Sequence, residues 1–85
     1  MREFTYTIQD ADGIHARPAG LLVKEAGKYQ SSITLCCGEK TGDAKRIFSV
    51  MALGVKCGQT LRVTAEGADE ETAAVSLEQF FKENL

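Results

Sequence analysis

The chain of 85 residues contains no tryptophan, one proline, one histidine and three cysteines. It also lacks any apolar run long enough to cross a membrane, and residues 1–10 alternate polar and apolar side chains, unlike a secretion signal. The cysteines, Cys36, Cys37 and Cys57, are odd in number and include an adjacent pair, so we expect free thiols in a reducing compartment. These absences predict a cytoplasmic protein with no insertion into a membrane.

Zinc is the alternative use of the cysteines, and the sequence gives it little support. Cys36 and Cys37 are neighbours on a predicted strand, so their side chains point to opposite faces. Only His15 is available among histidines to complete a tetrahedral set. We therefore expect no metal and no other cofactor.

An excess of charge of one sign is also missing. Ten basic and twelve acidic side chains give a net charge of -2, so no global positive field is available to bind nucleic acid or anionic lipid. Hydrophobic residues make up 44% and charged residues 26%, as in a folded domain. The length predicts one domain, residues 1–85, and is too short for a large enzyme with a separate substrate domain.

Alternation of polar and apolar residues predicts strands at residues 2–8, 32–37 and 61–66. A turn at residues 38–40 leads from the second of these into a short strand that ends near Asp43. On each strand one phase is apolar and the other carries threonine and serine. This pattern predicts a sheet with one buried face and one face in water.

Apolar residues at helical spacing predict helices at 16–26, around 47–53 and from Asp69 onward. Gly27 and Gly54 are the expected stops of the first two, and Asp69 is the expected cap of the third, followed by acidic residues that suit the helix dipole. The inward positions expected on the second and third helices are Ile47, Val50, Met51, Ala73, Leu77, Phe80 and Phe81. The element order predicts an α+β fold in which three helices cover one face of a four-stranded, mainly antiparallel sheet.

His15 lies at the predicted start of the first helix, within residues 13–19 (GIHARPA). Helices usually open with Ser, Thr, Asp or Asn, and the absence of such a residue leaves the first amides of the helix free for an anion. With the guanidinium of Arg17 and an imidazole beside them, these amides form a phosphate site that contains a nucleophile. The helix dipole disfavours a positive charge there, so we expect a neutral imidazole. An ordinary surface or capping histidine is the open alternative.

Residues 13–19, together with residues 45–54 (KRIFSVMALG) and 65–70 (AEGADE), resemble the histidine-containing phosphocarrier (HPr) family of the bacterial phosphoenolpyruvate:sugar phosphotransferase system. The resemblance covers essentially the whole chain and implies an open-faced βαββαβα sandwich. It implies that His15 accepts a phosphoryl group from enzyme I on Nδ1 and passes it to IIA domains of sugar permeases. It further implies that the phosphate lies against the Arg17 side chain and the amides of Ala16 and Arg17. Such a carrier holds a phosphohistidine but is not a stand-alone catalyst.

The resemblance also implies a docking surface around His15. Phe48 is expected to face outward, because Ile47, Val50 and Met51 fill the inward stripe; burial of Phe48 in the core is the alternative. An exposed phenylalanine with a basic rim on an acidic protein suits a transient dock for acidic partners. The expected docking residues are Gly20, Lys24, Lys45, Arg46, Phe48, Ser49 and Met51.

Two positions depart from the family. Arg46 stands where many members carry a regulatory serine that an ATP-dependent kinase phosphorylates, and arginine cannot accept that phosphate. Ser49, nearly one helical turn further on, is the substitute candidate. Asp12 stands where a neutral polar residue is common, and its carboxylate could repel a phosphate on His15 if it turns inward.

Two other functions stay open at this point. One is a carrier in a regulatory or dihydroxyacetone-kinase phosphorelay; the other is a non-catalytic binding module that works through Phe48, with His15 incidental. An RNA-binding domain of similar strand order is excluded, because the open face of the sheet carries threonine and serine where stacking aromatics would be needed. We expect a monomer that binds enzyme I and IIA domains and no nucleic acid.

Overall fold

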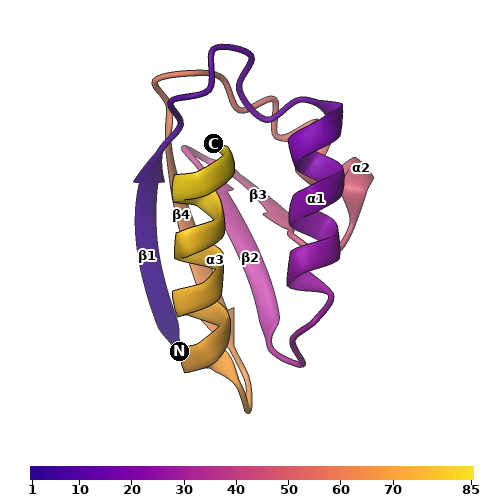
Figure 1. Ribbon diagram of the computed structural model, residues 1–85, viewed down its shortest axis with the longest axis vertical. Helices are drawn as coiled ribbons and strands as arrows, with labels where there is room; N and C mark the ends of the chain where they lie inside the picture. The colour runs from indigo at the N-terminus through magenta and orange to yellow at the C-terminus, as the bar shows by residue number, and fades with distance from the viewer.

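Four strands form one sheet in the order β1-β4-β2-β3, and every neighbouring pair is antiparallel. The computed structural model describes residues 1–85 (Figure 1). Its elements are β1 (Arg2–Thr7), α1 (Ala16–Ala26), β2 (Ser32–Cys37), β3 (Lys40–Asp43), α2 (Ile47–Ala52), β4 (Thr60–Glu66) and α3 (Glu70–Asn84). The predicted α+β fold and βαββαβα order are confirmed.

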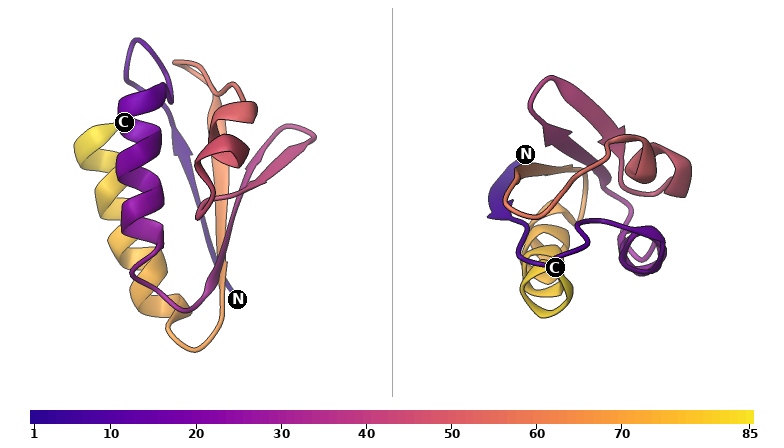
Figure 2. Two further views of the ribbon diagram at one scale, coloured as in Figure 1. Left: turned by 90° about the vertical axis from the view of Figure 1, so that its right-hand side faces the viewer. Right: turned by 90° about the horizontal axis from the view of Figure 1, so that it is seen from above.

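Helices α1 and α3 lie side by side over one face of the sheet, and the short α2 stands beside α1 and β3 (Figure 2). The opposite face is uncovered. Its side chains are polar, as predicted: Thr5, Thr7, Ser32, Thr60 and Arg62 are exposed, and Thr34 and Thr64 are half-buried. None of the helices has the length and apolar composition needed to cross a bilayer.

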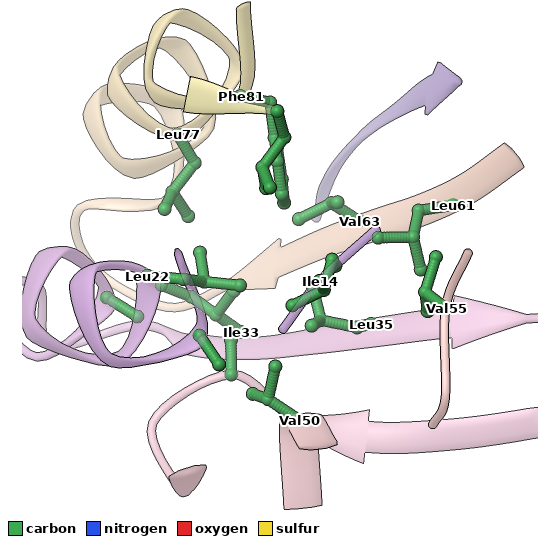
Figure 3. Close-up of a cluster of buried hydrophobic side chains, with 14 of the residues drawn as sticks. Ile14, Leu22, Ile33, Leu35, Val50, Val55, Leu61, Val63, Leu77 and Phe81 are labelled. Atoms are coloured by element: carbon green, nitrogen blue, oxygen red, sulfur yellow. The ribbon is translucent and has the colours of Figure 1, made fainter. Parts of the chain in front are cut away.

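The core lies between the helices and the inner face of the sheet. Phe81 of α3 is fully buried and packs against Phe4 and Tyr6 of β1, with ring centroids 5.8 and 5.7 Å apart. Figure 3 shows side chains of the helices and strands converging there, among them Leu22, Leu77, Ile33, Leu35 and Val63. This packing holds α1 in place, and the start of α1 carries His15.

The inward placement of Met51 was wrong. Met51 is exposed, Ile47 is half-buried, and Val50 is the buried residue of α2. The helix has six residues, so it presents less than two turns to the core. Its buried side points toward Val50, about 100° around the axis from Met51.

The capping role predicted for Asp69 was also wrong. Asp69 occupies the N-cap position of α3, but its side chain caps no amide of the helix. The carboxylate instead accepts hydrogen bonds from the amides of Gln30 and Ser31 and from the Ser31 hydroxyl. Ser31 is fully buried, so its polar groups need partners, and that need outweighs the local preference for a cap. The acidic first turn, Glu70 and Glu71, is as predicted.

Candidate functional site

His15 is the N-cap residue of α1, in extended conformation with φ −92° and ψ −173°. The loop before it is held against the loop that precedes β4, because the amide of Ile14 donates to the carbonyl of Val55 at 3.0 Å. At Gly13 φ is +66°, and a Cβ there would stand 2.3 Å from the Val55 carbonyl oxygen. Glycine is therefore required for the chain to pass this point and deliver His15 to the mouth of the helix.

The mouth of α1 has unused hydrogen-bond donors. No side chain caps the helix and its first turn holds no acidic residue. The amides of Ala16 and Arg17 form no hydrogen bond within the protein, and Pro18 has no amide hydrogen. The predicted absence of a cap is confirmed, and the open amides with the Arg17 side chain can bind an anion.

A surface pocket opens at this helix mouth. It is lined by Asp10, His15, Arg17, Pro18, Leu21, Glu83 and Asn84. The structure thus brings the last turn of α3 next to the start of α1. Sequence reasoning missed Glu83 and Asn84, because nothing in their local pattern distinguishes them from other polar residues of a helix end. Asp10 was also missed, although an acidic residue five positions before the histidine was a signal that could have been used.

Carboxylates give the site its negative side. Oδ2 of Asp10 lies 4.0 Å from Nε2 of His15, and the two side chains are 30% and 42% exposed. One donor atom from each of Asp10, Asp12 and His15 lies within 4.8 Å of the others, so Asp12 has turned toward the imidazole. The amide of Asp12 donates to Oδ1 of Asp10 at 2.9 Å. The imidazole of His15 therefore has both carboxylates and the Arg17 side chain in its surroundings.

Helices α1 and α2, which pack against each other, both carry exposed apolar side chains. Phe48 is 84% exposed, which agrees with the outward position expected for it, and Met51 and Leu21 are also exposed. A Cβ on Gly20 would meet Cδ1 of Ile47 at 3.9 Å, so Gly20 lies where α1 and α2 pack together. Of these side chains, Leu21 lines the pocket with His15, and Phe48 and Met51 are exposed on α2, which packs against α1.

The polar residues expected to dock partners fall into two groups. Lys24 and Arg46 are exposed, and no hydrogen bond or ion pair within the protein engages their charged groups. Lys45 is half-buried, and its Nζ donates to the carbonyl of Tyr29 at 2.6 Å. Ser49 is half-buried, and its Oγ accepts a hydrogen bond from the amide of Asp43 at 2.8 Å. Lys45 and Ser49 thus make structural contacts that sequence reasoning did not find.

An open-faced sandwich whose single histidine stands at an uncapped helix mouth beside an arginine defines a phosphocarrier domain. The chain matches the family model "PTS HPr component phosphorylation site" over residues 2–83. It is 42% identical over 79 residues to the phosphocarrier protein HPr of Mycoplasma capricolum, covering 93% of this chain and 89% of that one. The chain belongs to the HPr family and is a phosphocarrier of the phosphotransferase system.

Solved structures agree with this assignment. A histidine-containing phosphocarrier protein of Mycoplasma superposes with a TM-score of 0.94 at 39% identity, covering 96% of this chain and 93% of that one. HPr of Thermoanaerobacter tengcongensis superposes with a TM-score of 0.93 at 40% identity, covering 98% and 93%. An HPr from the same organism has also been solved as a dimer.

Proposed function

We propose that His15 is the residue that carries the phosphoryl group, that enzyme I supplies it, and that IIA domains of sugar permeases accept it. The observation that carries this proposal is the uncapped mouth of α1, where free amides and Arg17 stand beside the only imidazole of the chain. The family assignment supplies the phosphotransferase context.

The transfer is a direct substitution at phosphorus. An unprotonated ring nitrogen of His15 forms the new bond to phosphorus as the bond between phosphorus and the donor breaks, and the electron pair of that bond leaves with the donor. The other ring nitrogen keeps its proton throughout. Positioning and stabilisation of the phosphoryl charge carry such a reaction, and the Ala16 and Arg17 amides with the Arg17 guanidinium supply both. Donation to a IIA domain is the reverse of the same step.

Partners would dock over Phe48 and Met51, with the cations of Lys24 and Arg46 at the rim. The exposure of Phe48 on the short α2, next to α1, supports this placement. Gly20 lies at the contact between α1 and α2, where a Cβ would make an ordinary van der Waals contact with Ile47, and it would present a small surface to the partner. Lys45 and Ser49 would stabilise the segments that carry the dock, because their polar atoms already form hydrogen bonds with Tyr29 and Asp43.

The test is to incubate the protein with enzyme I and phosphoenolpyruvate and to measure acid-labile phosphate by mass spectrometry. We expect one phosphate per chain on the unmodified protein and none on His15→Ala. A His15→Ala protein that still gains phosphate would contradict the proposal. Size-exclusion chromatography with light scattering checks the monomer, which stays a prediction, as does the cytoplasm as its location.

A second candidate is a carrier in another phosphorelay, such as a regulatory or dihydroxyacetone-kinase relay. Arg46 favours it, because the position departs from the serine that many sugar-transport carriers use for regulation. The chemistry at His15 would be the same and only the partners would differ. Transfer from phosphorylated His15 to a dihydroxyacetone-kinase subunit faster than to any IIA domain would favour this candidate.

A further inference from the structure

Asp10 is fixed in place next to the imidazole of His15. Its amide donates to a backbone oxygen of Leu85 at 2.8 Å, and its own carbonyl accepts from the amide of Gly13 at 2.9 Å. Its Oδ1 accepts from the amide of Asp12 at 2.9 Å. The remaining oxygen, Oδ2, forms no hydrogen bond within the protein and lies 4.0 Å from Nε2 of His15.

A neutral imidazole carries one proton and one lone pair on its two nitrogens, and only the nitrogen with the lone pair can attack phosphorus. The group that faces one nitrogen decides where the proton lies, because a carboxylate accepts a hydrogen bond from N–H and repels a lone pair. With Oδ2 of Asp10 beside Nε2, the proton belongs on Nε2 and the lone pair on Nδ1.

We propose that Asp10 is a positioning residue that holds the proton of His15 on Nε2 and so makes Nδ1 the attacking nitrogen. The inference rests on the proposed role of His15. When Nδ1 bonds to phosphorus the ring becomes cationic, and the positive charge shared by Nε2–H lies next to the Asp10 carboxylate. Asp10 therefore favours the transfer in two ways: it selects Nδ1 as the attacking nitrogen, and its negative charge stabilises the cationic ring that forms.

The distance of 4.0 Å exceeds a hydrogen bond, as is common for catalytic contacts before a ligand or partner arrives. The electrostatic interaction between the Asp10 carboxylate and the imidazole acts at this distance without any shortening of the contact. Three other charged groups face the same space, Asp12, Arg17 and Glu83. Asp12 also has an oxygen within 4.8 Å of a ring nitrogen, and Asp10 is the group that makes an ion-pair contact, with Nε2 at 4.0 Å.

The test measures the tautomer directly by 15N nuclear magnetic resonance of the His15 ring at mildly alkaline pH. We expect the Nε2–H form to dominate in the unmodified protein. In Asp10→Ala the ratio of Nε2–H to Nδ1–H should fall about fivefold, the scale of a charge interaction across 4 Å in a water-like medium. Phosphoryl transfer from enzyme I should slow by up to about fivefold, because fewer rings carry the lone pair on Nδ1 and the cationic ring loses the Asp10 charge.

Asp10→Asn gives a sharper test than alanine. If its amide oxygen keeps the hydrogen bond from the Asp12 amide, its NH₂ group takes the place of Oδ2 and faces Nε2 as a donor. The tautomer ratio should then fall at least as far as in Asp10→Ala, in a protein that keeps its loop geometry. Glu39→Gln is the control: it removes an exposed carboxylate in the turn between β2 and β3 and should leave the ratio unchanged.

An unchanged tautomer ratio in both Asp10 variants, or a dominant Nδ1–H form in the unmodified protein, would overturn the inference. A shifted ratio with an unchanged transfer rate would equally overturn the positioning role. The spectrum needs no partner, so it separates the two proposals. If the ratio shifts as expected but His15 takes no phosphate from enzyme I, the proposed function fails, whereas phosphorylation with an unmoved ratio defeats the role of Asp10 alone.

Discussion

The carboxylate of Asp69 accepts hydrogen bonds from both the hydroxyl and the amide of Ser31, at 2.5 and 2.9 Å. The amide of Gln30 donates to the same carboxylate at 2.9 Å. These contacts join the turn before α3 to the loop before β2, 38 positions apart in sequence. They stabilise the ionised form, so the Ser31 hydroxyl first, and then the Gln30 amide, lower the pKa of Asp69 below its usual value.

This lowered pKa predicts a loss of stability in acid. The stabilisation is complete above the ordinary value of about 3.9 for an unfolded aspartate, and it is lost as pH falls through the lower value of the folded protein. Urea unfolding of the unmodified protein and of Ser31→Ala between about pH 2 and 6 checks this. Ser31→Ala should unfold at a lower urea concentration, and its free energy of unfolding should depend less on pH across this window. Ser32→Ala, an exposed serine on the open face, is the control and should match the unmodified protein.

Arg17→Ala should slow phosphoryl transfer from phosphorylated enzyme I without unfolding the domain. The side chain is exposed at the helix mouth, so its loss removes charge beside the phosphate and little packing. Loss of one such donor costs roughly a hundredfold in rate. Rapid-quench kinetics and a thermal melt measure the two effects. Arg17→Lys should recover only part of the rate, because it restores the charge without the planar fork. Equal rates in Arg17→Ala and the unmodified protein would contradict the proposed phosphate contact.

Phe48→Ala should weaken binding to enzyme I about tenfold, the scale of a central aromatic contact in an interface. The melting temperature should stay near that of the unmodified protein, because Phe48 is 84% exposed. Titration calorimetry measures the affinity, and added salt should slow association if the basic rim contributes. Val75→Ala removes another exposed side chain, on α3, and serves as the control. Equal losses in both variants would indicate a nonspecific effect.

We expect the ATP-dependent kinase of related carriers to leave this protein unphosphorylated, because Arg46 stands at the position of the regulatory serine. We expect Ser49 not to replace the missing serine, because the residue is half-buried and its Oγ accepts a hydrogen bond from the Asp43 amide. Mass spectrometry after incubation with kinase and ATP should find seryl phosphate on Arg46→Ser and none on the unmodified protein. Phosphate mapped to Ser49 would refute this prediction.

The exposed charge of Arg46 should also act in docking. At the N-terminus of α2 it opposes the helix dipole, at a cost of about 0.3 to 1 kcal/mol. Arg46→Glu should therefore weaken binding to enzyme I or a IIA domain while leaving the melting temperature almost unchanged. Lys40→Glu makes the same charge change on β3 and controls for net charge. Equal affinities of the Arg46→Glu and unmodified proteins would argue against the dock.

Lys45 should behave differently from Arg46, because its ammonium donates to the Tyr29 carbonyl and ties two loops together. Lys45→Met keeps most of the stem and removes the donor, so we expect a loss of about 1 kcal/mol in the free energy of unfolding. Urea unfolding measures this loss, with Lys40→Met, an exposed lysine, as the control. Weakened partner binding at unchanged stability would instead place Lys45 in the dock.

The secondary structure and the helix mouth were readable from sequence because they depend on near neighbours. Helix α1 spans residues 16–26 as the apolar spacing predicts, and the alternating segments form strands with the expected inner faces. Gly54 has φ +60°, the left-handed stop expected after α2. The sequence likewise shows that no capping side chain precedes Ala16, and this leaves the first amides of α1 open beside His15.

Only the tertiary structure decided which groups meet across the chain. The sequence around Asp69 is typical of a helix cap. In the folded protein its carboxylate instead accepts hydrogen bonds from Ser31, a buried residue 38 positions away. In the sequence Lys45 cannot be told from a surface lysine, and only the fold places the Tyr29 carbonyl beside its ammonium. Glu83 lies near His15 because α3 packs beside α1. The sequence by itself determined the elements and the chemistry of the helix mouth, since these follow from spacing along the chain. Folding decided the partner of each polar side chain, because every buried donor competes for acceptors that distant segments bring together.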